Sequence, residues 1–113
     1  PIDRQRALAP KLVAAGADVV VGSHAHILLG GGFLRGAYVH YGLGNFVFYS
    51  RGGLTAQSGV LLLTTRGRAI TSSRWVPAVI SGGIHIPLDG AAADRAVDTW
   101  QSLRRCTALS AKP

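Results

Sequence analysis

The first hydrophobic pattern along the chain is helical. Between residues 4 and 15, apolar side chains recur at Leu8 and Leu12, at helical spacing. Asp3 stands where an N-cap is expected, and Gly16 stands where a helix commonly ends. The pattern therefore predicts a helix over residues 4–15.

The same period returns near the other end of the chain. Residues 91–105 carry apolar positions at helical spacing, through Trp100 and Leu103. This predicts a terminal helix, and we expect residues 88–113 to form a C-terminal helical extension. Trp75 and Trp100 are expected to pack in the core.

Between these helices the pattern is that of β-strands. Residues 18–22 form a short run of mostly β-branched side chains, which predicts a strand buried on both faces. Residues 37–41 and 46–49 are rich in strand-forming types. In the second of these, Phe46 and Phe48 alternate with a valine, so we expect both rings to pack in the core.

Turn residues divide the strands. The glycine run 30–32 predicts a loop, because glycine weakens a strand interior, and Arg35-Gly36 predicts a hairpin turn. Residues 59–65 and 69–80 predict a β-hairpin whose second strand ends near Pro77. The whole pattern predicts an α/β fold with a mixed sheet, a β-hairpin and a terminal helix.

Length and composition narrow the class of protein. The 113 residues suffice for one domain at most, and because they open at Pro1 without an initiator Met we expect a fragment of a longer protein. Twelve basic against five acidic side chains give a formal charge of +7, which favours an anionic partner. The basic residues are spread singly, which argues against nucleic acid. Cys106 is alone, so no intrachain disulfide forms, and no apolar run approaches the roughly 20 residues of a membrane span.

Candidate chemistry lies at the end of the first strand, in Gly22-Ser23-His24-Ala25-His26. Open α/β sheets place ligands and reactive groups at such strand ends. Two histidines one residue apart can point to the same side, and neutral imidazole binds Zn, Mn, Fe and Co ions. A pair of exposed or hydrogen-bonded histidines without a metal is the alternative.

Three other polar residues have two interpretations each. Asn45 either adopts a left-handed turn or directs its amide into a cleft beside His24 and His26. His40, on a strand, is expected to be packed or on the surface. Alternation places His85 on the outward face of an edge segment, and we assign it no role.

Three blocks together carry a family resemblance. They are Gly16-Ala17-Asp18-Val19-Val20-Val21-Gly22-x-His24-x-His26, Tyr41-x-Leu43-Gly44-Asn45-Phe46-Val47-Phe48, and a Ser58-Gly59 strand leading to a hairpin that ends in Val76-Pro77. From Gln5 to about Pro87 the chain resembles the C-terminal part of the bacterial poly-γ-glutamate capsule synthesis proteins of the CapA type. That family belongs to the calcineurin-like metallophosphoesterase superfamily.

The resemblance implies the C-terminal part of an α/β/β/α sandwich. It also implies that His24 and His26 are metal ligands in a two-metal centre of Mn, Fe or Zn, where a bridging hydroxide attacks a phosphoester. The chain departs from the family pattern at Ala25, where Pro is common, and at Gly42, where Ser is common. The family's Asp-bearing and Asn-His elements lie upstream of the matched region and have no counterpart here. We therefore expect this chain alone to bind metal weakly and to be inactive.

Two functions follow from the resemblance. One is a metal-dependent phosphoesterase acting in capsule or envelope polymer synthesis, with Asn45 as a candidate catalytic residue. The other is a non-catalytic component of polymer assembly or export that binds poly-γ-glutamate or membrane partners. Arg35 and Arg51 border the motif blocks and are candidates for an anionic substrate, with solvated surface arginines as the alternative. The family implies a location at the cell envelope.

Overall fold

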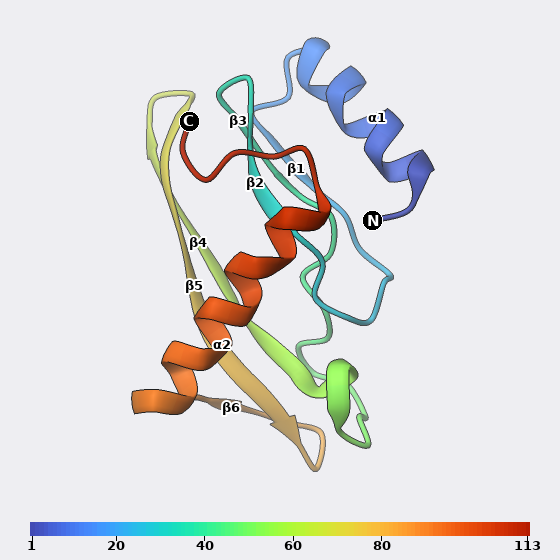
Figure 1. Cartoon of the computed structure of the whole chain (residues 1–113), viewed down its shortest axis with the longest axis vertical. Helices are drawn as coiled ribbons and strands as arrows, with labels where there is room; N and C mark the ends of the chain where they lie inside the picture. Colours follow the sequence, from blue (N-terminus) through green and yellow to red (C-terminus); the bar gives the residue numbers. More distant parts are fainter.

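The computed structural model describes residues 1–113 (Figure 1). Its elements, in chain order, are α1 (Asp3–Ala14), β1 (Val19–Val21), β2 (Gly31–Leu34), β3 (Ala37–His40), the short 3-10 helix η1 (Gly53–Ala56), β4 (Gln57–Arg66), β5 (Ala69–Ser81), β6 (Ile84–Pro87), α2 (Gly90–Ser102) and the 3-10 helix η2 (Leu103–Cys106). The strands form two three-stranded sheets, in the orders β1-β3-β2 and β4-β5-β6. The first sheet is mixed, and the second is antiparallel. The predicted α/β fold with a mixed sheet, a hairpin and a terminal helix is confirmed.

Helix α1 covers one face of the first sheet (Figure 1). Ala9 is 1% exposed and packs with Val39 of β3, whereas Leu8 and Leu12 are half-exposed. The small alanine side chain allows the helix to lie close to the strands. Asp3 is the first helical residue rather than the N-cap, and its charge still favours the helix N-terminus. Gly16, with φ of +102°, ends the helix as predicted.

Strand β1 is not buried on both faces, contrary to the prediction from its composition. It pairs in parallel with β3 and lies at the edge of its sheet. Val20 packs with the core under α1, while Val19 and Val21 are 40% and 48% exposed. Alternation puts these two valines on the face opposite to the helix, and no other element of the chain covers them.

Two glycines of the run are part of a strand, so the loop predicted at residues 30–32 is wrong at Gly31 and Gly32, while Gly30 lies outside the strand. Gly31 and Gly32 belong to β2, which forms a hairpin with β3 through the Arg35-Gly36 turn, as predicted. A Cβ on Gly31 would collide with the ring of His40, and one on Gly32 would lie 2.5 Å from the carbonyl oxygen of Ser110. Glycine is present here because neighbouring groups approach the β2 backbone too closely for a side chain.

The second sheet is built on the predicted hairpin of β4 and β5. Strand β5 continues to Ser81 instead of ending near Pro77. The reason is a third strand, β6, which pairs with residues 78–81. The carbonyl of Pro77 also accepts a hydrogen bond from the backbone N–H of Leu88, so proline lies inside the ladder without breaking it.

Helix α2 packs on β5 through two stacked indoles, which confirms Trp75 and Trp100 as core residues. Their ring centroids are 5.5 Å apart with an angle of 5° between planes. His40 lies beside them, completely buried, and its Nε2 accepts a hydrogen bond of 3.1 Å from Trp100 Nε1. This contact joins the first sheet to the second through the terminal helix.

Two expectations about aromatic and edge positions are wrong. Residues 46–49 form no strand, and Phe46 and Phe48 are 52% and 48% exposed rather than in the core. The chain leaves the sheet at Gly44, whose φ is +73°, so no neighbouring strand pairs with this segment. On β6, His85 is half-buried against Phe46, with ring centroids 4.2 Å apart, whereas the flanking isoleucines face outward. None of the helices is long and apolar enough to cross a membrane.

Candidate metal centre

The histidine pair lies on the loop that follows β1. Gly22 extends the strand by donating its N–H to the carbonyl of His40, at 2.7 Å. A Cβ at Gly22 would collide with the carbonyl of Tyr41, so glycine is needed where the loop begins. The parallel pairing of β1 and β3 thus places this loop beside the chain that leaves β3.

Both histidines have left-handed backbone conformations. His24 has φ of +73° and His26 has φ of +56°. Outside glycine this conformation costs about 1 kcal/mol or more per residue, and such strain clusters at functional sites. Both side chains are exposed, and their ring centroids are 5.5 Å apart. The structure therefore brings together the two residues that the sequence singled out.

Asn45 fixes the orientation of His26. Its side chain is 6% exposed, and its Nδ2 donates to the carbonyls of His26 at 3.2 Å and of Thr55 at 3.0 Å. With both amide protons used, Oδ1 is the atom that faces His26 Nδ1, at 2.7 Å. Because Oδ1 can only accept, Nδ1 donates this hydrogen bond, and in the neutral imidazole the lone pair is then on Nε2.

Asn45 itself does not adopt the left-handed turn that was one interpretation of its position. The positive φ belongs to Gly44, and the Asn45 amide is directed at His26. Its backbone is held as well, because the Ser58 hydroxyl donates to the carbonyl of Asn45 at 2.5 Å. The supporting roles of Thr55 and Ser58 were missed from the sequence, although the Ser58-Gly59 landmark was a signal for the second of them.

The surroundings of the pair are largely apolar. The ring of Phe48 lies 4.8 Å from that of His26, centroid to centroid. A hollow of about 500 Å³ lies beside His24, with Ile2, Ile27 and Leu29 in its wall. Arg35 forms the turn between β2 and β3, at the opposite end of β3 from His40 and the histidine loop. Arg35 therefore lies away from the histidine pair.

No group of three His, Cys, Asp or Glu side chains lies close enough together to hold a metal ion. Asp18, which precedes β1, forms an ion pair with Arg68 at 3.0 Å. His40 is enclosed among the indoles, and burial, with a smaller contribution from the charge of Arg104, lowers its pKa from 6.5 to about 4. Within this chain the candidate centre therefore comprises His24 and His26, with Asn45 behind them.

The fold and the site define an α/β chain that presents a histidine pair at the end of a parallel strand. Residues 1–50 match the family described as bacterial capsule synthesis protein PGA_cap. The capsule biosynthesis protein CapA of Bacillus anthracis is 35% identical over 91 residues, which cover 80% of this chain and 22% of that protein. The PGA biosynthesis protein CapA of Bacillus subtilis (strain 168) is 50% identical over 48 residues, which cover 42% of this chain and 13% of that protein.

These matches confirm the resemblance to the CapA-type proteins of the PGA_cap family that the sequence motifs predict. The family match ends at residue 50 and includes the histidine pair and Asn45. The matched segments span 22% of the first of these relatives and 13% of the second.

Proposed function

We propose that the protein acts in the synthesis of a capsule polymer of the poly-γ-glutamate type, through a metal-dependent phosphoesterase centre to which His24 and His26 contribute two ligands. The family match and the two relatives support the role in capsule or poly-γ-glutamate biosynthesis, and the family also favours a location at the cell envelope. The phosphoesterase activity is the finer part of the proposal.

The observation that carries the metal site is the hydrogen bond between Asn45 and His26. Metal-binding histidines commonly donate their other ring N–H to a fixed acceptor, which sets the tautomer and aims the free nitrogen at the metal. Asn45 Oδ1 is such an acceptor, at 2.7 Å, and it is fixed by the two bonds of its own amide. The Nδ1 side of His26 is therefore occupied by Asn45, and Nε2 is the ring nitrogen left to bind a metal.

The other residues of the site complete this arrangement. His24 offers a second exposed imidazole on the same loop, and Phe48 packs against the ring of His26 and limits its rotation. Divalent ions bound there, of Mn, Fe or Zn, would supply Lewis-acid activation of a phosphoester and of water. The remaining ligands would come from parts of the longer protein outside these 113 residues. Asn45 is a positioning residue in this scheme and not a catalytic one.

Metal analysis of the complete protein tests the assignment. Bound Mn, Fe and Zn are measured in the wild type and in His24→Ala and His26→Ala, together with hydrolysis of a phosphodiester and a phosphomonoester. We expect both variants to lose metal and hydrolysis. His85→Gln is the matched control, because that histidine contacts Phe46 instead of the pair.

The outcomes separate the two functions. Unchanged metal content in both alanine variants would exclude the ligand assignment. Metal loss without hydrolysis of any phosphoester by the wild type would favour the non-catalytic role in polymer assembly or export.

A further inference from the structure

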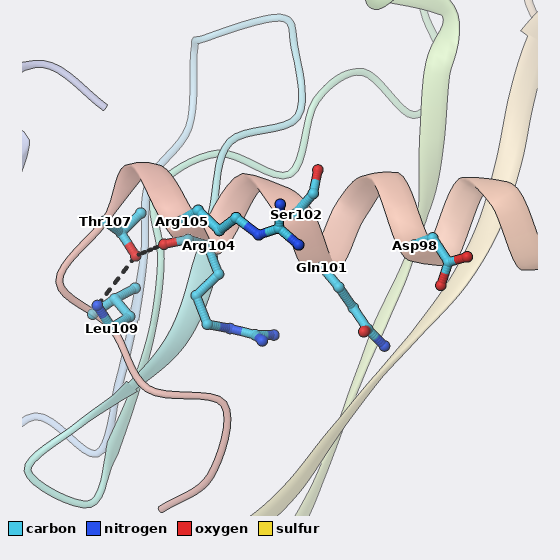
Figure 2. Close-up of a pocket in the computed structure, with 7 residues that line it drawn as sticks. All are labelled: Asp98, Gln101, Ser102, Arg104, Arg105, Thr107 and Leu109. Atoms are coloured by element: carbon cyan, nitrogen blue, oxygen red, sulfur yellow. Dashed lines mark hydrogen bonds between the residues drawn. The ribbon is translucent and has the colours of Figure 1, made fainter.

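A second hollow, with a polar lining, lies at the C-terminal end of α2, and none of its lining residues belongs to the histidine loop. It has a volume of about 510 Å³, and all but one of its lining residues are polar (Figure 2). Thr107 and Leu109 lie at one end of it and Asp98 at the other. Arg104 and Arg105, then Gln101 and Ser102, lie between these two ends. None of the residues of the candidate metal centre lines this hollow.

Arg104 is held in a fixed orientation. Its Nε donates to the carbonyl of Gly31 at 2.9 Å, and its guanidinium carbon lies 5.9 Å from the ring centroid of Trp100. The side chain is half-buried, and its two terminal amino groups make no hydrogen bond within the chain. A guanidinium pinned at one nitrogen keeps its remaining donors ready for an anion.

The hollow carries two arginines against one carboxylate, that of Asp98, so its lining keeps a net positive charge. The single ion pair of the molecule joins Arg68 to Asp18, so neither Arg104 nor Arg105 is paired with a carboxylate. Both arginines lie in η2, which directly follows α2. Basic residues at the C-terminal end of a helix are favoured by the helix dipole, which accounts for their sign. The dipole does not account for the hydrogen bond of Arg104 to the backbone of Gly31 in β2.

We propose that this hollow binds a chain of carboxylates, with Arg104 and Arg105 as its anchors. The planar fork of each guanidinium matches the two oxygens of a carboxylate, and adjacent forks suit a polymer that repeats this group. Gln101 and Ser102 add neutral hydrogen-bonding groups. Only one lining residue, Leu109, is hydrophobic, which disfavours a hydrophobic ligand. The identity of the chain as γ-linked glutamate rests on the capsule role proposed above.

Binding of a labelled, short γ-linked glutamate oligomer to the complete protein tests the proposal, measured by fluorescence anisotropy. Arg104→Gln and Arg105→Gln are each expected to weaken binding about tenfold or more, the usual effect of losing a charge-assisted hydrogen bond. Arg95→Gln is the matched control: it removes the same charge from an exposed position of the preceding helix α2, outside the hollow, and is expected to change affinity less than about twofold. Arg104→Lys keeps the charge but loses the fork, and should bind more weakly than wild type.

Several results would overturn the proposal. Equal loss in all three glutamine variants would mean attraction by net charge alone. Displacement of the oligomer by inorganic phosphate at equal concentration would mean a simple phosphate site. Absence of oligomer binding by the wild type would also overturn it. Arg105 is exposed, so Arg105→Gln still tests the proposal if the Arg104 variants fail to fold.

Metal content and hydrolysis of small phosphoesters, measured on the same variants, keep this proposal separate from the metal centre. Both are expected to be unchanged in Arg104→Gln and Arg105→Gln. Failure of the histidine variants to lose metal would leave the oligomer result standing, and failure of oligomer binding would leave the metal result standing.

Discussion

His26 and His40 occupy opposite kinds of environment, although both belong to the same half of the chain. His26 is exposed, has a left-handed backbone, and has its Nδ1 proton bound by Asn45 with Nε2 free. His40 is completely buried in a regular strand, and its Nε2 is occupied by the N–H of Trp100. One histidine is strained and open to a ligand, while the other is closed and joins two sheets. The comparison teaches that the accessible lone pair, not the residue type, marks the candidate ligand.

The largest effect on stability should come from the buried cluster of His40, Trp75 and Trp100. Trp100→Ala removes the indole that stacks on Trp75 and donates to His40, and we expect it to lower the free energy of unfolding by about 3–5 kcal/mol. Urea unfolding measures this. Leu54→Ala, at a position 63% exposed, should change stability by less than about 0.5 kcal/mol. A loss for Trp100→Ala no larger than that of the control would mean that the indole stack does not join the sheets.

A pH dependence should follow from the same cluster. Burial, then the charge of Arg104, lowers the pKa of His40 to about 4, from 6.5 in the unfolded chain. Between pH 4 and pH 6.5 the unfolded chain binds a proton at His40 that the folded chain does not. The contribution of neutral His40 to the free energy of unfolding is therefore complete above pH 6.5 and is lost as pH falls to 4. The loss amounts to about 3 kcal/mol.

Unfolding free energies measured across pH 4–7 check this. His40→Gln is the comparison, because it cannot take up the proton, and its stability should fall less steeply over the same range. Parallel curves for the two proteins would contradict the assignment to His40.

Substitutions at the histidine pair and Asn45 should change metal affinity. Asn45→Ala removes the acceptor of His26 Nδ1, and the loss of such a partner weakens metal binding by about 10–100-fold. Asn45→Asp keeps the acceptor oxygen but loses the donors to His26 and Thr55, so its metal affinity should be closer to wild type than that of Asn45→Ala. Metal titration of the complete protein measures both, and equal loss in the two variants would indicate a structural role for Asn45.

The two regions also differ in how well they were predicted from the sequence. The helices, the two hairpins and the histidine pair follow from periodicity, turn residues and motif, all of which are local. Gly31 and Gly32 lie in a strand because they pair with β3, and they are glycines because His40 and Ser110 approach their backbone too closely for a side chain. The contact with Ser110 joins residues far apart in the sequence, so no local signal predicts it. The hydrogen bond of Asn45 to His26 spans 19 residues, so the motif predicted proximity while only the fold supplied the tautomer.

The exposure of Phe46 and Phe48 and the inward position of His85 were missed for a related reason. Alternation predicts which side chains share a face, but it does not predict whether anything covers that face. At Gly44 the chain leaves the sheet, and the following aromatic side chains lie beside His26 and His85 instead of in the core.

The smallest predicted effect concerns the backbone strain at His24, and it tests whether that strain accompanies metal binding. His24→Gly relieves a left-handed backbone at an exposed residue, and we expect the free energy of unfolding to rise by up to about 1 kcal/mol while bound metal falls. His24→Ala keeps the strain and serves as the control, because it should lose metal without this gain in stability. Urea unfolding and metal analysis on the same samples measure both quantities. A glycine variant that is less stable than the alanine variant would mean that the loop does not hold His24 under strain, and the case for a preformed ligand pair would then rest on His26 and Asn45 alone.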